Sequence, residues 1–187
     1  MGRAEVARSR HVALLRGINV GKAKRIAMAD LRALVEGLGF TDVRTLLNSG
    51  NVVFTATGST AKSAAARIEK AIAAELGIEA RVTVLSAAEL DAIVDANPLL
   101  DVAKDASRLL VAVPQDPADR AKLLLLQKQL WGRDTLAVGP RAAYVWCAGG
   151  ILESKLAEAV GRALGSGVTS RNWATMLKIQ ALTRDET

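Results

Sequence analysis

The sequence predicts an α+β fold in which one order of strands and helices occurs twice. Short apolar or β-branched runs alternate with helical patterns in the order β-α-β-β-α within residues 11–76, and the same order returns within residues 108–164. Half of the 187 residues are hydrophobic, which allows a sizeable core and excludes a disordered chain. Aromatic residues make up only 3%, so we expect a core of aliphatic side chains.

The first half of the chain carries clear boundary signals. Two helical patterns end at a glycine, Gly39 and Gly77, a residue that often terminates helices. Two β-rich runs are separated by Asn48-Ser49-Gly50-Asn51, which predicts a hairpin. We therefore expect strands at 12–15, 43–47, 52–55 and 81–85, and helices at 28–38 and 60–76.

A helix is expected between the two halves. Ser86 followed three residues later by Glu89 forms a capping box, and Asn97-Pro98 ends the helical pattern near Ala96.

The second half repeats the order of elements without obvious sequence identity to the first. Asp116-Pro117 opens a helical pattern that extends to Leu130, and Leu152, Leu156, Val160 and Leu164 would share one helix face. We expect strands at 108–113, 136–138, 142–147 and 168–169, and helices at 117–130, 152–164 and 172–182.

These elements predict two ferredoxin-like β-α-β-β-α-β units, residues 11–85 and 108–182, joined by a helical linker at 86–107. Residues 11–15 and 109–113 are apolar on both strand faces, so both faces of each sheet should be covered. The linker helix, the last helix, the other half or a second subunit in a homodimer could cover the open faces.

Charge is concentrated near the N-terminus. Residues 1–25 hold seven basic side chains and one acidic one, and the other residues hold 18 of each sign. The net charge of +6 therefore describes a basic tail and a basic loop, residues 16–25. Such a loop is either simply solvated or a site for an anion.

Composition excludes several classes of protein. A single cysteine, Cys147, permits no internal disulfide and suits a reducing cytosol, so we expect a cytoplasmic protein. With His11 as the one histidine, a zinc site of the usual ligand types is not expected, and both residues read as core. Residues 1–10 do not read as a signal peptide, and no run approaches the ~20 apolar residues of a membrane helix. No cofactor is expected.

Two polar clusters should meet at one edge of the first sheet. In a ferredoxin-like unit the turn after the first strand and the hairpin tip lie at the same edge. Glycines permit close approach of a ligand to the backbone, and arginine can bind a phosphate through two hydrogen bonds. The candidate binding residues there are Arg16, Gly17, Asn19, Gly21, Lys22, Ser49, Gly50 and Asn51.

Structural roles remain alternatives for these residues. Asn48 and Asn51 could cap the hairpin turn, and Arg16 could form a buried salt bridge. The spacing matches neither a Walker phosphate loop nor a dinucleotide fingerprint.

A third cluster, Ser170-Arg171-Asn172-Trp173, opens the last predicted helix. Thr169 or Ser170 is the expected N-cap. Arg171 and Asn172 would lie at the positive end of the helix dipole, where an anion is favoured, so they join the candidate binding residues. Trp173, with Met176 and Leu177, is expected to anchor the helix in the core.

Four motifs in order carry a family resemblance. Leu-Arg-Gly-Ile-Asn-Val-Gly, Gly-Phe-Thr-Asp-Val-Arg-Thr, Asn-Ser-Gly-Asn-Val-Val-Phe and Ser-Arg-Asn-Trp-Ala-Thr resemble the bacterial domain-of-unknown-function family numbered 1697 over residues 11–182. The resemblance implies the two-unit α+β architecture. It implies no activity, cofactor or catalytic residue. Asn48 stands where members of that family often have glutamine.

The sequence favours a protein that binds a small anionic, phosphate-bearing ligand at residues 16–22 and 48–51. One alternative is nucleic-acid binding through the basic tail and loop. RNA-recognition sheets of this strand order stack bases on aromatics, and only Phe54 and Tyr144 lie near such positions. Another is a dimeric interaction module without catalytic activity. No reaction and no catalytic residue can be named, so enzyme activity stays open.

Overall fold

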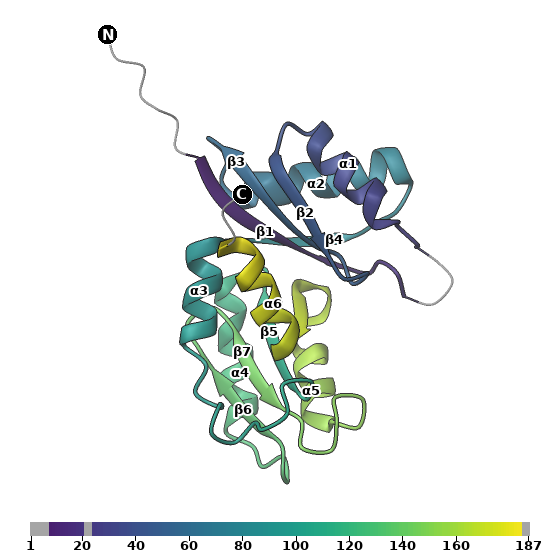
Figure 1. Ribbon diagram of the computed structural model, residues 1–187. Coiled ribbons are helices and arrows are strands. Elements are labelled where there is room, and N and C mark those ends of the chain that lie inside the picture. Colours follow the sequence, from purple (N-terminus) through teal and green to yellow (C-terminus); the bar gives the residue numbers. More distant parts are fainter. Residues whose placement is uncertain (1–7, 21–23, 185–187) are drawn as a thin grey trace. The chain divides into compact units, whose positions relative to one another are not determined.

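The computed structural model describes residues 8–20 and 24–184 (Figure 1). Over this part of the chain it has six α-helices, two short 3-10 helices and two four-stranded antiparallel sheets, which confirms the α+β class. The described residues up to Ala88, together with those from Ile179 onward, form one compact unit. Glu89–Lys178 form the other. Residues 86–107, the predicted linker, thus fall largely within the second unit, and the last helix is divided between the two.

The first unit contains a sheet of strand order β2-β3-β1-β4. Two helices share a core with this sheet, and all the strands and helices predicted for it are present. Their bounds are β1 Arg8–Arg16, α1 Met28–Gly37, β2 Thr41–Leu46, β3 Asn51–Thr57, α2 Ala61–Leu76 and β4 Arg81–Ser86.

Local chemistry accounts for the ends of α2. The Thr60 side chain accepts a hydrogen bond from the Ser63 backbone N–H at 3.1 Å and so caps the first turn. Gly77 ends the helix in the left-handed conformation, at φ 64°, which glycine adopts without a steric cost.

Strand β1 is buried on both of its faces. Ala13 and Leu15 belong to the core beneath α1 and α2. Val12 and Leu14 point to the opposite face and are equally buried. The apolar run therefore reflects a strand without a wet face, as the sequence predicts.

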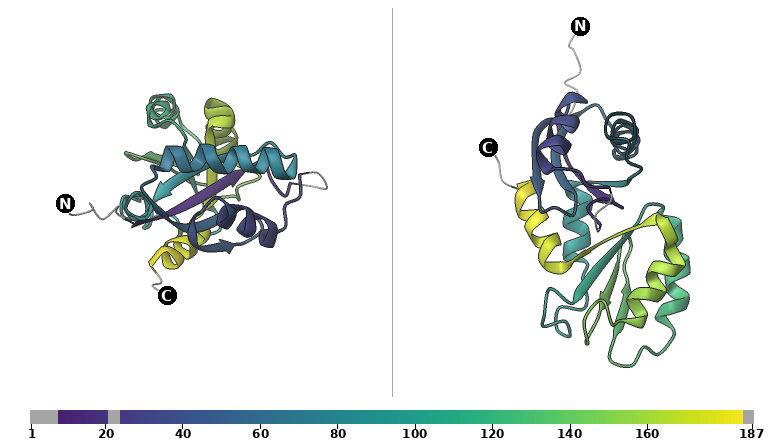
Figure 2. Two further views of the ribbon diagram at one scale, coloured as in Figure 1. Left: turned by 90° about the horizontal axis from the view of Figure 1, so that it is seen from above. Right: turned by 90° about the vertical axis from the view of Figure 1, so that its right-hand side faces the viewer.

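The second unit contains a sheet of order β6-β7-β5-β8. Figure 2 shows α4 and α5 side by side on one face of this sheet, where they share its core. The unit begins within α3, and its elements are α3 Ala87–Asp95, β5 Leu109–Pro114, α4 Arg120–Gln127, β6 Thr135–Val138, β7 Ala143–Trp146, α5 Lys155–Leu164 and β8 Val168–Asn172. The helix α6, Trp173–Arg184, follows β8 directly.

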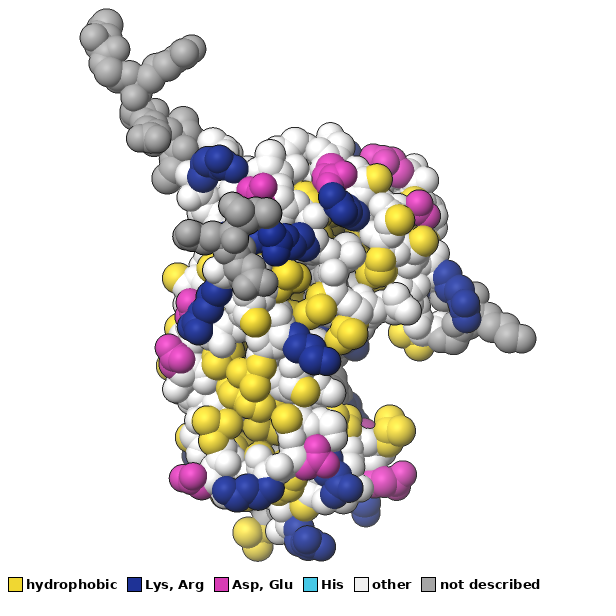
Figure 3. Space-filling view, viewed as in Figure 1, with side chains coloured by type: hydrophobic (Ala, Val, Ile, Leu, Met, Phe, Trp, Pro, Cys, Tyr) yellow, Lys and Arg dark blue, Asp and Glu magenta, His cyan; other side chains and the backbone are white. Residues whose placement is uncertain are grey.

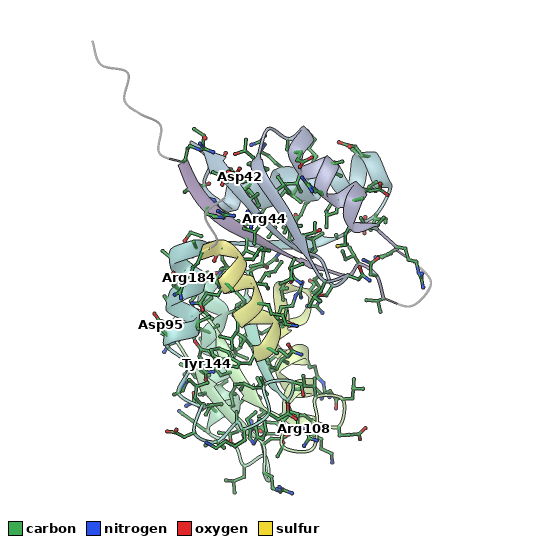
Figure 4. The ribbon with its side chains drawn as sticks, viewed as in Figure 1. Asp42, Arg44, Asp95, Arg108, Tyr144 and Arg184 are labelled. Carbon is green, nitrogen blue, oxygen red and sulfur yellow. The ribbon has the colours of Figure 1, made fainter. Side chains whose placement is uncertain are left out.

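Helix α3 lies on the other face of the second sheet. Ala143 and Val145 belong to the core beneath α4 and α5, so Tyr144 between them points to the opposite face. There its hydroxyl donates a hydrogen bond to the Ile93 carbonyl at 2.5 Å, and the side chain is buried (Figure 4). The predicted linker helix thus covers this face.

Two helices are shorter than predicted, and a polar cap sets the start of one of them. Helix α5 begins at Lys155, since Ser154 caps it through the Ala157 N–H, and this leaves Leu152 98% exposed outside the helix. Helix α4 ends at Gln127, and Leu130 is 99% exposed. Leu130 and Leu152 thus lie outside the helices predicted to contain them.

The C-terminal boundary also differs from the prediction. Residues Val168–Asn172 form a full strand, so neither Thr169 nor Ser170 caps a helix. The Asn172 side chain does so instead, accepting a hydrogen bond from the Thr175 N–H at 2.9 Å. Trp173 is buried as predicted, whereas Leu177 is 40% exposed and lies outside the buried stripe.

No helix within the described ranges is both long and apolar enough to cross a membrane.

Candidate anion-binding site

The loop after β1 and the hairpin between β2 and β3 lie together, as the predicted strand order requires. The Leu15 N–H donates to the Gly50 carbonyl at 2.8 Å. The Asn19 side-chain amide donates to the Asn48 carbonyl at 2.7 Å. Residues about thirty positions apart in the sequence therefore share one edge of the first sheet.

Asn19 closes the loop that follows β1. It adopts a positive φ of 53°, which asparagine tolerates better than most residues. Its side-chain oxygen accepts from the Ile26 N–H at 2.8 Å, and its amide nitrogen donates to the Ile26 carbonyl at 3.1 Å as well as to Asn48. Both amide hydrogens thus serve the fold, and Asn19 is tied to Ile26 and to the hairpin.

The hairpin tip is tightly packed. Gly50 has a φ of 81°, and a Cβ added there would lie 2.7 Å from Ile18 Cδ1 and 2.8 Å from Leu15 Cβ. Asn51 is fully buried, and its amide donates to the Leu46 carbonyl at 2.7 Å and to Ser49 Oγ at 3.0 Å. These contacts give Gly50 and Asn51 a part in holding the hairpin, while Ser49 is exposed.

The remaining candidates lie elsewhere. Gly21 and Lys22 are outside the described residues. Arg171 and Asn172 belong to the second unit, in β8. Arg171 donates to the Ser170 carbonyl at 2.9 Å, and burial lowers the pKa of its guanidinium to about 10. Asn172 caps α6.

A pocket of about 600 Å³ opens in the first unit beside the end of β1, the start of β4 and one face of α2. It includes Arg16 and Gly17 but none of Asn19, Ser49, Gly50 and Asn51. The pocket is lined by Arg16, Gly17, Lys24, Ala66, Glu69, Lys70, Ala73, Glu79, Ala80 and Arg81.

The basic residues of the pocket come from four places in the fold. Arg16 and Arg81 are direct register partners in the antiparallel pair β1–β4. Lys24 belongs to the loop after β1, and its ammonium group donates to the Glu79 carbonyl at 3.5 Å. Lys70 projects from α2. Four cations and two carboxylates line the pocket, so its charge is positive.

Glu69 is held in place by the edge of the sheet. Strand β4 is an edge strand, so some of its N–H groups have no neighbouring strand to bind. The Val82 N–H donates to Glu69 Oε1 at 2.8 Å. This bond fixes the carboxylate against β4 and gives a backbone N–H of the edge strand an acceptor.

Sequence reasoning missed the contribution of α2 and β4. Lys70 and Arg81 look like ordinary surface residues in the sequence. The available signal was the strand order, because β4 runs antiparallel beside β1 and its first residue must therefore lie beside the last residue of β1.

The single histidine and the single cysteine are both buried. His11 is buried and stacks on Phe54, with ring centroids 5.6 Å apart. Cys147 is buried in the second unit, and burial raises the pKa of its thiol. In the part of the chain that the structure describes, no group of three or more His, Cys, Asp and Glu residues could hold a metal ion.

Comparisons with known proteins agree with this architecture. A solved structure described as that of conserved bacterial protein SP0830 from Streptococcus pneumoniae is 22% identical and has a TM-score of 0.74, over 95% of this chain and 100% of that one. At this identity the likeness concerns the fold alone. Among curated proteins, none matches. The model of a family described as "Protein of unknown function (DUF1697)" matches residues 8–144, so the chain belongs to the DUF1697 family.

Proposed function

We propose that this protein binds a small phosphate-bearing anion in the pocket beside β1, α2 and β4. The observation that carries the proposal is the pairing of Arg16 with Arg81 in that pocket. Like charges directly opposite one another destabilise a pair of strands, whereas an anion bound between them would turn the repulsion into two attractions. Arginine also presents the planar donor geometry that phosphate oxygens match.

The surrounding loop supports the proposal. Gly17 follows Arg16 with a φ of 83°, and a Cβ placed there would meet no atom within 4 Å. The backbone is therefore open beside the arginine. Asn19 and Gly50 brace this loop against the hairpin, which would hold Arg16 and Gly17 in place before a ligand arrives. The predicted hairpin residues thus support the loop that carries Arg16 and Gly17 and do not line the pocket themselves.

We also infer that both units are ferredoxin-like. Each has the element order β-α-β-β-α-β, and the strand orders β2-β3-β1-β4 and β6-β7-β5-β8 are equivalent. A cytoplasmic location belongs to the same proposal, because the single cysteine is a free thiol.

Nucleic-acid binding is less well supported. Stacking of bases needs exposed aromatic side chains, and Phe54 and Tyr144 are both buried. On the face drawn in Figure 3, basic side chains are interspersed with acidic ones. A continuous basic surface, which a nucleic-acid backbone would need, is not drawn on that face.

Calorimetric titration with inorganic phosphate and pyrophosphate tests the proposal. Arg81→Gln should weaken binding of both at least about tenfold, because it removes a charged hydrogen-bond donor. Arg133→Gln removes the same charge from an exposed position in the second unit and should leave the affinity unchanged. Failure of the wild-type protein to bind either anion, or equal binding by Arg81→Gln, would overturn the proposal.

A further inference from the structure

We propose that the pocket selects a phosphorylated polyol, such as a sugar phosphate, over a nucleotide. This inference rests on the proposed function and narrows it to one class of ligand. It starts from the apolar part of the pocket wall, which consists of the three alanines Ala66, Ala73 and Ala80. None of the lining residues is aromatic or a large aliphatic, so the wall offers a base no aromatic or large aliphatic side chain to pack against.

The pocket is much larger than a phosphate group needs. Its volume of about 600 Å³ lies in the range typical of sites for small organic molecules, roughly 300–1,000 Å³. The arginine pair lies at one wall, where β1 ends and β4 begins. The remaining space, along α2, must accept the body of the ligand.

Two carboxylates in the lining, Glu69 and Glu79, limit the chemistry of the part of the ligand beyond its phosphate. Glu69 is half-buried, and one of its oxygens already accepts from the Val82 N–H. A carboxylate has about four acceptor sites on its two oxygens, so Glu69 and Glu79 can accept hydrogen bonds from ligand hydroxyls. They would repel a second phosphate, which disfavours a polyphosphate in this part of the pocket.

The four cations in the pocket disfavour a ligand that would pair with the carboxylates through a positive charge. An ammonium group on the ligand would bind Glu69 or Glu79 but would be repelled by the lysines and arginines around it. A neutral hydroxyl has no such penalty. A single phosphate followed by several hydroxyl groups therefore fits the whole lining, with the phosphate at Arg16 and Arg81 and the hydroxyls at the glutamates.

Calorimetric titration with inorganic phosphate, ribose 5-phosphate and adenosine 5′-monophosphate tests this selection. Ribose 5-phosphate should bind at least about tenfold more tightly than phosphate, and adenosine 5′-monophosphate should bind less tightly than ribose 5-phosphate. Glu79→Gln should remove most of the advantage of ribose 5-phosphate but keep the affinity for inorganic phosphate. Glu75→Gln, at an exposed position of α2 outside the pocket lining, should change neither affinity.

Each contrary result has a distinct meaning. Equal binding of ribose 5-phosphate and phosphate overturns the selection and leaves the anion site intact. Binding of the nucleotide as tight as that of ribose 5-phosphate, or tighter, shows that the pocket accepts the base, and this also overturns the selection. Loss of the ribose 5-phosphate advantage in Glu75→Gln as well would contradict the assignment to Glu79. If wild-type protein binds none of the three, the proposed function fails together with this inference. Melting curves of each variant show that the fold is retained.

Discussion

Arg16 and Arg81 lie directly opposite one another in neighbouring antiparallel strands. Two cations in this relationship repel, and the cost is of the order of 0.2–1 kcal/mol. We therefore expect Arg81→Thr, which also introduces a good strand former, to raise the melting temperature in low salt. The gain should shrink in high NaCl, because exposed charges are screened. Thermal unfolding at several salt concentrations measures this. A variant that is less stable at every salt concentration would show that the pair does not repel.

The amide of Asn19 should matter to stability far more than that of Asn48. Asn19→Ala removes three side-chain hydrogen bonds and places alanine at a positive φ, so we expect a loss of about 1–3 kcal/mol in the free energy of unfolding. Asn48 contributes its backbone carbonyl to the same network, which Asn48→Ala keeps. That variant should stay within about 0.5 kcal/mol of wild type in urea unfolding. Equal losses in the two variants would contradict this division of roles.

Gly50 and Gly77 separate the cost of an unusual backbone conformation from the cost of a steric clash. Both have positive φ, but a Cβ at Gly77 meets no atom within 4 Å, whereas one at Gly50 meets Ile18 and Leu15. Gly77→Ala should cost about 1–2 kcal/mol from the left-handed conformation alone. Gly50→Ala should cost at least about 1 kcal/mol more because of overpacking. Urea unfolding compares them, and equal costs would mean that the hairpin moves aside freely.

Tyr144 makes stability depend on pH at the alkaline end. Burial raises the pKa of its hydroxyl from 10.0 to about 12. The unfolded chain loses this proton near pH 10 and the folded chain keeps it, so the contribution of Tyr144 is full below pH 10. It falls by about 1.4 kcal/mol per pH unit between pH 10 and 12. Tyr144→Phe should lack this slope.

Absorbance of the tyrosinate ion provides a direct measurement, since the chain has one tyrosine. Ionisation near pH 10 in the native protein would contradict the burial of the hydroxyl.

The elements of the fold could be read from the sequence where side-chain period and a glycine or capping residue agree. Helix α2 is the clearest case, because Thr60 and Gly77 mark both of its ends. Prediction failed where a tertiary or polar contact outweighed hydrophobic spacing. Leu152 continues the apolar stripe of α5 in sequence, but Ser154 caps the helix after it. The Asn172 cap similarly allows β8 to continue through residues that read as a helix start.

The candidate site could be predicted only in part. The approach of the β1 loop to the hairpin follows from strand order, and the bond between Asn19 and Asn48 confirms it. The sequence does not show which of these residues hold the loop in place and which line the pocket, because this depends on the direction of each side chain. Lys70 enters the pocket from a helix more than fifty residues after Arg16, and no local pattern marks it.

Chemical labelling of the buried Cys147 thiol can report local opening of the second unit. The thiolate is the form of cysteine that attacks alkylating reagents, and burial both shields this sulfur and raises the pKa of the thiol. Reaction with the native protein must therefore wait for the core of β7, α4 and α5 to open. Since the chain has a single cysteine, the labelling rate at low reagent concentration reads the free energy of that local opening without any engineered probe. The stability of one unit can thus be followed while ligands are added to the other.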